Sequence, residues 1–377
     1  MNRKRILVDF RQLNAAVHRA STVLFPDADA FLNRQSLLYD GFSYGLYGTP
    51  TIRQLEDQVA EIEGGVRSIA LPSGLAAMTH PLLALCRSGD HVLMVDCAYG
   101  PTRAFAKDAL SRLGVEVEFF ASDSVSIKDK LRANTRVVIV ESPGYYTMEL
   151  QDIEAIAAEA HTVGALVMID NSWGFGSTDM FALGVDICCT ALSKYASGAG
   201  DLCMGSVTVA DEELFRTLKA FIANLGAGVS SDEAYLVLRG LGTMQVRVRE
   251  QAERALEVGR WLDAHPAVSR VLCPPLESDG YHERYRRFFR CGNGLLSVLL
   301  REPAIEPLKG LIDGFSHFRI GASWGSSHSL VSITEPAKSR DVDSWEDGVF
   351  LLRIHLGLEP LELLKGDLEA GFDRLKT

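Results

Sequence analysis

The chain has 377 residues, of which 47% are hydrophobic and 23% are charged. This length suits one large α/β unit or two coupled domains, and the composition allows a sizeable buried core. With 38 basic against 49 acidic residues the net charge is -11, so the chain lacks the basic surplus that nucleic-acid binding requires. Length, composition and charge therefore exclude a disordered, collagenous or basic nucleic-acid-binding protein.

The start of the chain is not expected to be a secretion signal. A basic stretch at residues 3–5 precedes an apolar run that stops at Asp9, too soon for a signal peptide. The longest apolar runs, such as residues 295–300, are far shorter than the roughly 20 residues that cross a bilayer. Seven cysteines without a C-x-x-C pair indicate reduced thiols and no metal site. We expect a cytoplasmic protein without a membrane partner.

An extended arm is expected over residues 1–48, which end in a glycine-rich stretch. From residue 88 to 170, strand and helix patterns alternate at short spacing. Apolar or alternating runs predict strands at 91–95, 115–119, 137–140 and 166–169, and helical spacing predicts helices over 101–113 and 153–160. Unbroken apolar strands joined by helices are typical of a mostly parallel sheet that is covered on both faces.

The sequence changes in character beyond about residue 239. A long amphipathic helix is predicted over 246–262, a strand at 351–354 and a last helix over 361–375. This order favours a smaller α+β domain after the parallel sheet. The expected division is an N-terminal arm (1–48), a large domain (49–238) and a C-terminal small domain (239–377).

Parallel sheets bind ligands at the carboxyl ends of their strands. The residues after the apolar runs are therefore candidates, namely 96–99, 141–143 and 170–173. A further candidate is Lys194, which follows the apolar stretch 185–192 and lies among small residues. Such a lysine can be desolvated enough to act as a nucleophilic amine and form a Schiff base.

Pyridoxal phosphate (PLP) chemistry requires such a lysine, an acid at the pyridine nitrogen and amide donors for the phosphate. Asp170, at a predicted strand end, can be the acid. The turn at residues 72–77 opens a predicted helix whose free amides attract an anion, so it can bind the phosphate. The order of these elements along the chain therefore favours a PLP site.

A second pattern predicts a different enzyme. Residues 321–325 match the G-x-S-x-G motif of serine hydrolases, and Asp343 and His355 follow Ser323 in the required order. That motif needs a strand before it and a helix after it, whereas residues 326–333 have no helical pattern. Serine hydrolysis through Ser323 is kept as a remote alternative.

A set of motifs that covers nearly the whole chain resembles one family in its order. The motifs are residues 44–51, 72–74, 141–144, 170–173, 191–195, 238–241 and 352–359. Together they resemble the Cys/Met-metabolism family of PLP-dependent enzymes. The resemblance implies the α/β fold of fold-type I PLP-dependent transferases, with a mostly parallel central sheet between helices, a smaller α+β C-terminal domain and bound PLP.

The resemblance implies a role for each residue of the cofactor site. Lys194 would hold PLP covalently and then act as general base at the substrate Cα. Asp170 would keep the pyridine nitrogen protonated, and Tyr99 would stack on the ring. The residues implied to bind the phosphate are Gly74, Leu75 and Ser193, together with Tyr44 from a neighbouring subunit.

The implied substrate site consists of Arg353, which would bind the α-carboxylate through two contacts, and of Ser323 and Trp324, which would line the pocket together with Tyr44. Residues 323–325 are most similar to bacterial cystathionine β-lyases, because γ-lyases and γ-synthases usually carry leucine at the position of Trp324. Three positions depart from the usual family pattern: Leu46, where arginine is usual, Ala199, where histidine is usual, and His328, where glutamate or threonine is usual.

The expected function is that of a PLP-dependent C–S β-lyase, which cleaves L-cystathionine or related cysteine S-conjugates to a thiol, pyruvate and ammonia. With L-cystathionine the thiol is homocysteine, which leads toward methionine. The alternatives are γ-elimination or γ-replacement, possibly on an unusual amino acid, and a relative without turnover. Because the site would borrow Tyr44, at least a homodimer is expected, and the family usually forms tetramers.

Overall fold

The structure is a computed structural model that describes residues 13–302 and 304–375. Its helices are α1 (Ala28–Leu32), α2 (Pro50–Glu63), α3 (Gly74–Leu85), α4 (Gly100–Phe105), α5 (Ile153–His161), α6 (Glu212–Leu225), α7 (Ser231–Asp263), α8 (His282–Phe288), α9 (Ile305–Asp313) and α10 (Leu361–Arg374). Its strands are β1 (Arg67–Leu71), β2 (His91–Val95), β3 (Glu116–Phe120), β4 (Thr135–Glu141), β5 (Leu166–Asp170), β6 (Ile187–Thr190), β7 (Gly205–Val209), β8 (Val268–Leu272), β9 (Leu295–Leu300), β10 (Arg319–Ile320), β11 (Leu330–Thr334) and β12 (Leu351–His355).

The larger sheet has the strand order β1-β7-β6-β5-β4-β2-β3. Pairing from β6 through β5, β4 and β2 to β3 is parallel, and only β7 runs antiparallel to its two neighbours. The predicted mostly parallel sheet is therefore confirmed. Glu141 and Asp170 are register partners at the carboxyl ends of β4 and β5, so the two acidic residues are neighbours at the same edge of the sheet.

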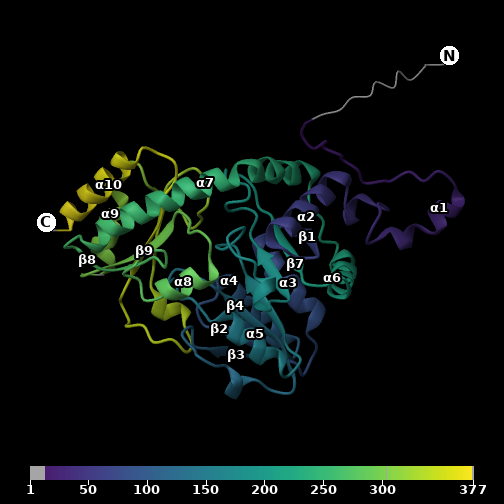
Figure 1. The fold of residues 1–377 in the computed structure, drawn as a ribbon, viewed down its shortest axis with the longest axis horizontal. Coiled ribbons are helices and arrows are strands. Elements are labelled where there is room, and N and C mark those ends of the chain that lie inside the picture. Colours follow the sequence, from purple (N-terminus) through teal and green to yellow (C-terminus); the bar gives the residue numbers. More distant parts are fainter. Residues whose placement is uncertain (1–12, 303, 376–377) are drawn as a thin grey trace, which may run out of the picture.

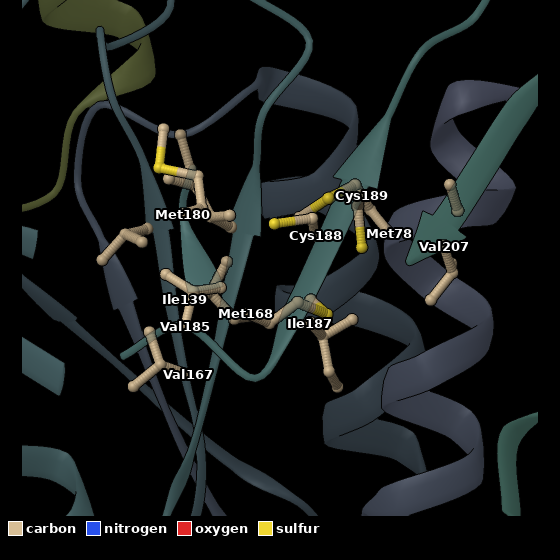
Figure 2. Packing of buried hydrophobic residues seen from close by; sticks show 14 of the residues in the cluster. Met78, Ile139, Val167, Met168, Met180, Val185, Ile187, Cys188, Cys189 and Val207 are labelled. Atoms are coloured by element: carbon tan, nitrogen blue, oxygen red, sulfur yellow. The ribbon is translucent and has the colours of Figure 1, made fainter. Parts of the chain in front are cut away.

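Helices cover this sheet because its strands are apolar on both faces. The helices α3 and α5 pack against β7 and β5, respectively. Figure 2 shows the interior that results, where Met168 and Ile187 come from paired positions on β5 and β6 and Met78 lies nearby on α3. The continuous core explains why these strands were readable from the sequence as unbroken apolar runs.

Local signals set the helix ends that flank the site. The helix α2 begins at Pro50, a residue that suits the first helical turn. The preceding residue, Thr49, caps the helix because its side chain accepts a hydrogen bond from the amide of Ile52. It ends at Glu63 and is capped by Gly64, whose φ of 78° lies in the left-handed region. In the same way Ser73 caps α3 by accepting from the amide of Ala76 at 3.0 Å.

The smaller sheet has the order β10-β11-β12-β9-β8 and is mainly antiparallel. A second apolar cluster joins it to α7, α9 and α10. In Figure 1 the long helix α7 lies along one side of the molecule and extends from the region of α2 to that of α9. The domain boundary predicted at residues 238 and 239 falls inside α7, so this helix would belong to both proposed domains.

The described part of the predicted arm, residues 13–48, carries α1 away from both sheets (Figure 1). Residues 1–12 of that arm lie outside the described residues. Leu13, Leu24 and Leu32 are exposed apolar side chains of this segment. Among the described residues, no helix combines the length and the apolar character that a bilayer crossing needs.

Candidate active site

A cavity of about 350 Å³ lies at the carboxyl ends of β4 and β5, next to the start of α3. The cavity gathers residues from both sheets, because Arg353 on β12 reaches the edge where Asp170 ends β5. The sequence-predicted residues that line it are Gly74, Leu75, Tyr99, Asp170, Ser193, Lys194, Ser323, Trp324 and Arg353. Tyr44 does not line this cavity.

Lys194 lies in the turn after β6, where its amide donates to the carbonyl of Ala191 at 3.1 Å. Its Nζ donates to Ser323 Oγ at 2.7 Å. Burial, helped by the positive charge of Arg353, lowers the pKa of Lys194 to about 8, and Asp170 opposes part of this shift. Compared with an exposed lysine, more of this amine is therefore uncharged near neutral pH, and the uncharged amine is the state that attacks a carbonyl carbon.

Asp170 is partly buried at the end of β5, and its Oδ1 accepts from the amide of Ser172 at 3.0 Å. Burial raises the pKa of Asp170, while the hydrogen bonds from Ser172 and the charge of Lys194 lower it. A carboxyl group in such surroundings is stabilised as an anion when a cationic N–H donates to it. The protonated nitrogen of a pyridine ring is such a donor.

The start of α3 lines one end of the cavity, where it could bind an anion. A Cβ at Gly74 would lie 2.6 Å from Ala191 Cβ, so only glycine lets the helix approach the turn before Lys194. The first amides of a helix have no partner within it, and together with the helix dipole they attract phosphate. The hydroxyl of Ser193, in contrast to these amides, already has partners within the protein: it donates to Met204 O at 3.1 Å and accepts from Met204 N at 2.9 Å.

Arg353 is 2% exposed, which is unusual for an arginine. Its Nη2 donates to Ala322 O at 2.7 Å, whereas its buried Nη1 has no hydrogen-bond partner. A buried cationic N–H without a partner is costly unless an anion meets it. Since Arg353 lines the cavity, its Nη1 could donate to a bound carboxylate.

The loop before β11 places Ser323 and Trp324 above Lys194. The Lys194 Nζ lies 5.4 Å from the centre of the Trp324 ring, and this ring is 5.4 Å from that of Tyr195. Trp324 is thus a buried wall of the cavity, and Ser323 is the hydrogen-bond acceptor that holds the lysine.

The serine hydrolase alternative is wrong, because the three residues do not form a triad. His355 Nε2 accepts from the amide of Gly325 at 3.0 Å, and its Nδ1 lies 3.2 Å from His328 O. Asp343 accepts from the amide of Ser122 at 3.0 Å rather than from a histidine. His355 therefore holds the loop that carries Ser323 instead of activating its hydroxyl.

His355 makes the stability of the protein depend on pH. Burial lowers the pKa of His355 from 6.5 to about 4. The unfolded chain binds this proton below pH 6.5 and the folded chain does not until about pH 4, so stability is full above pH 6.5 and declines as the pH falls. Between pH 6.5 and 4, we expect the unfolding free energy to fall by about 3 kcal/mol more than in His355→Gln. Urea unfolding at fixed protein concentration and at several pH values measures the unfolding free energy of both proteins. An equal change of this free energy with pH in the two proteins would contradict the prediction.

Sequence reasoning identified Glu141 only as a strand-end residue and overlooked Tyr145 and Tyr146. Glu141 Oε2 accepts from the amide of Tyr99 at 2.6 Å and so fixes the backbone of the predicted stacking residue. Burial and the nearby Asp170 raise the pKa of Glu141 well above its usual value. Glu141, Tyr145 and Tyr146 all line the cavity, and the strand-end rule would have found the two tyrosines if extended by three residues.

The positions that depart from the family pattern lie outside the cavity lining. Ala199 is exposed, and the exposed His328 has its Nδ1 3.5 Å from Glu359 Oε1. Leu46 lies in the arm and faces a small separate cavity. Tyr44 is 44% exposed, also in the arm, so in a single chain it does not meet Lys194. Its predicted role through a neighbouring subunit stays a prediction.

The residues present fit PLP. The cavity combines a lysine with a lowered pKa, a carboxyl group at a strand end, and a helix start that approaches the lysine turn only because residue 74 is glycine. Lys194 would hold the carbonyl carbon of the cofactor, Asp170 its ring nitrogen and the start of α3 its phosphate. The unpartnered Nη1 of Arg353 remains for a substrate carboxylate.

Comparison with known proteins agrees with this reading. A family profile described as "Cys/Met metabolism PLP-dependent enzyme" matches residues 2–373. A putative cystathionine beta-lyase of Rhizobium johnstonii is 39% identical over 369 residues, which are 96% of this chain and 91% of that protein. The cystathionine beta-lyase MetC of Escherichia coli K12 is 36% identical, and the L-alanine/L-glutamate racemase of Wolbachia pipientis wMel is also 36% identical. Each of these two alignments covers 96% of this chain, with 94% of the former and 93% of the latter.

A solved structure has the same architecture. The crystal structure of metB from Corynebacterium glutamicum superposes with a TM-score of 0.89 at 28% sequence identity. The match covers 97% of this chain and 94% of the other. The similarity therefore extends through both sheets rather than through the cofactor-binding part alone.

Proposed function

This chain belongs to the Cys/Met-metabolism family of PLP-dependent enzymes, and on that premise we propose that it is a carbon–sulfur β-lyase. Its substrate is L-cystathionine or a related cysteine S-conjugate, and its products are a thiol, pyruvate and ammonia. The observation that supports this most is the hydrogen bond from Lys194 Nζ to Ser323 Oγ beside the buried Trp324, in one cavity with the unpartnered Nη1 of Arg353.

When bound, PLP supplies an electron sink that stabilises negative charge at the substrate Cα. Lys194 holds the cofactor and later removes the proton from Cα, and its pKa of about 8 suits a general base near neutral pH. Ser323 Oγ keeps the amine in place through the 2.7 Å hydrogen bond. Asp170 holds the proton on the ring nitrogen, and Tyr99 covers the ring face.

The other residues bind and orient. Arg353 donates its free Nη1 to the α-carboxylate, which places Cα between this arginine and Lys194. Trp324 forms a buried wall of the cavity beside the amine. The Cβ–S bond breaks as the electron pair left at Cα forms a double bond to Cβ, the sulfur leaves with the bonding electrons as a thiolate, and water converts the remaining fragment to pyruvate and ammonia.

We further propose that the active form is a homo-oligomer in which Tyr44 completes a neighbouring site at the phosphate. The exposed apolar residues of the arm and the absence of Tyr44 from its own cavity lining support this assembly. We propose that the chain is divided into an arm (1–48), a large domain (49–238) and a small domain (239–377). A dimer suffices for this arrangement, and a tetramer of two such dimers is the expected state.

The test is the identity of the keto acid released from L-cystathionine by the PLP-loaded protein. We expect pyruvate together with homocysteine, because Trp324 occupies the position that favours β-cleavage. Chromatography of the derivatised keto acid measures it. Release of 2-oxobutyrate with cysteine would instead assign γ-elimination. If no keto acid forms and L-alanine is converted to D-alanine, the lyase proposal is wrong.

A further inference from the structure

Tyr146 lies against the arginine that is assigned to the substrate carboxylate. The guanidinium carbon of Arg353 is 4.2 Å from the centre of the Tyr146 ring, within the range of a cation–π contact. The Tyr145 ring is more distant from the same guanidinium, at 5.5 Å. Because Arg353 is almost fully buried, this contact lies in a desolvated place where such interactions are strongest.

The hydroxyl of Tyr146 is held by the strand next to Arg353. Ser332 Oγ donates to Tyr146 OH at 3.3 Å. Ser332 on β11 and Arg353 on β12 are register partners, so their side chains are neighbours on the same face of the sheet. Tyr146 therefore spans the two strands, with its ring on one side chain and its hydroxyl on the other.

The backbone at Tyr146 is strained. Its φ of 67° lies in the left-handed region, which a bulky side chain rarely adopts, and Met148 follows with a φ of 62°. Strain of this kind persists only where surrounding contacts enforce it, and it is concentrated at functional sites. The turn is enforced here by the amide of Gly144, which donates to Glu149 O at 2.8 Å, and by that of Tyr145, which donates to Cys97 O at 2.9 Å.

The buried Arg340 also holds this turn from the segment between β11 and β12. Its Nη2 donates to Thr147 Oγ1 and, at 3.5 Å, to Tyr145 O. The segment that supplies Arg340 connects β11 to β12, the two strands of the smaller sheet that supply Ser332 and Arg353, whereas Tyr146 follows β4 of the larger sheet. The contact between Tyr146 and Arg353 therefore links the two sheets at the cavity.

We propose that Tyr146 is a positioning residue, which keeps the Arg353 guanidinium turned so that its unpartnered Nη1 meets the substrate α-carboxylate. Backbone contacts to Ala322 hold only Nη2 of Arg353, so the plane of the guanidinium is set by the ring that stacks on it. This inference rests on the proposed function, since it takes Arg353 as the carboxylate site.

The test separates carboxylate binding from turnover. The probe is 3-(methylthio)propionate, which has a carboxylate and a thioether but no amino group, so it cannot replace Lys194 on the cofactor. Its affinity for the PLP-loaded enzyme is measured by calorimetry in wild type, Tyr146→Gly, Tyr146→Phe and Arg353→Leu. Glycine accepts a φ of 67° without strain, so Tyr146→Gly removes the ring without a folding penalty at this turn.

We expect Tyr146→Gly to weaken probe binding by about 3- to 30-fold, and Tyr146→Phe, which keeps the ring, to stay within about 3-fold of wild type. With substrate, Tyr146→Gly should raise KM by a similar factor and leave kcat nearly unchanged, because the carboxylate contact is the same before and during reaction. A purely structural role would lower kcat as well.

Two results overturn the inference, and they differ in what else they overturn. If Arg353→Leu loses probe binding while Tyr146→Gly binds as tightly as wild type, Tyr146 has no positioning role and the proposed function stands. If Arg353→Leu binds the probe as well as wild type does, the carboxylate role of Arg353 fails, and this inference fails with it.

Discussion

Replacing Lys194 by alanine should reduce kcat/KM for L-cystathionine by about 10⁴-fold or more and abolish covalent attachment of PLP. The reason is that the proposed mechanism uses the Lys194 amine, whose pKa burial lowers to about 8, both as the attachment point and as the base at Cα. The amine donates a hydrogen bond to Ser323 Oγ at 2.7 Å, but this hydroxyl can replace neither role of the amine. Steady-state kinetics and mass spectrometry after borohydride reduction measure the two effects.

Two further variants make this result specific. Lys194→Arg keeps the positive charge but supplies no neutral amine, so it should be as inactive as the alanine variant. Lys309→Ala removes an exposed lysine that pairs with Glu306 on α9, and it should retain wild-type turnover. Reduced protein that still carries PLP after Lys194→Ala, with turnover intact, would overturn the assignment.

Replacing Asp170 by asparagine should lower kcat by roughly 10²- to 10³-fold and weaken PLP retention. Asp170 lies at the end of β5, where burial raises its pKa. A cationic N–H bound to this carboxyl group favours its ionised form. Asparagine keeps the shape and loses that charge. Because Asp170 also raises the pKa of Lys194, the variant should move that pKa below its value of about 8.

Stopped-time assays give kcat, and equilibrium dialysis gives the dissociation constant of PLP for the same protein. Asp201→Asn is the matched control, since this exposed aspartate lies seven positions after Lys194 and outside the cavity lining. It should behave as wild type in both measurements. An Asp170→Asn protein with unchanged kcat would show that another group holds the ring nitrogen.

The strands of the larger sheet were predictable because burial on both faces selects apolar runs. The runs at 137–140 and 166–169 became β4 and β5, and the alternating run at 115–119 became β3, shifted by one residue. The helix predicted over 153–160 is α5. The long helix was predicted from residue 246, whereas α7 begins at Ser231, because its first turns have a less regular apolar pattern and are stabilised by packing against α2.

The candidate site was predictable where a residue type at a strand end carries the chemistry. Asp170 and Lys194 were identified in this way, and Arg353 and Trp324 came from the family resemblance. The cavity brings these four residues together. Their roles stay predictions until the variants are measured.

The partners of these residues were decided by the tertiary structure. Nothing in the spacing of Ser323 and His355 reveals that the serine accepts from a lysine or that the imidazole accepts from the amide of Gly325. The hydrolase motif failed for this reason, since a motif states which groups follow one another and not which groups meet. Likewise, the φ of 67° at Tyr146 depends on contacts from residues almost 200 positions away, such as Arg340.

Sequence alone thus determined the α/β architecture, the family and the residue types at the strand ends, because burial and backbone geometry act through local pattern. The tertiary structure decided which polar atoms are paired and which, like Nη1 of Arg353, are left for a ligand. That distinction depends on hydrogen bonds between segments distant in the chain, whose distances and directions no local pattern encodes.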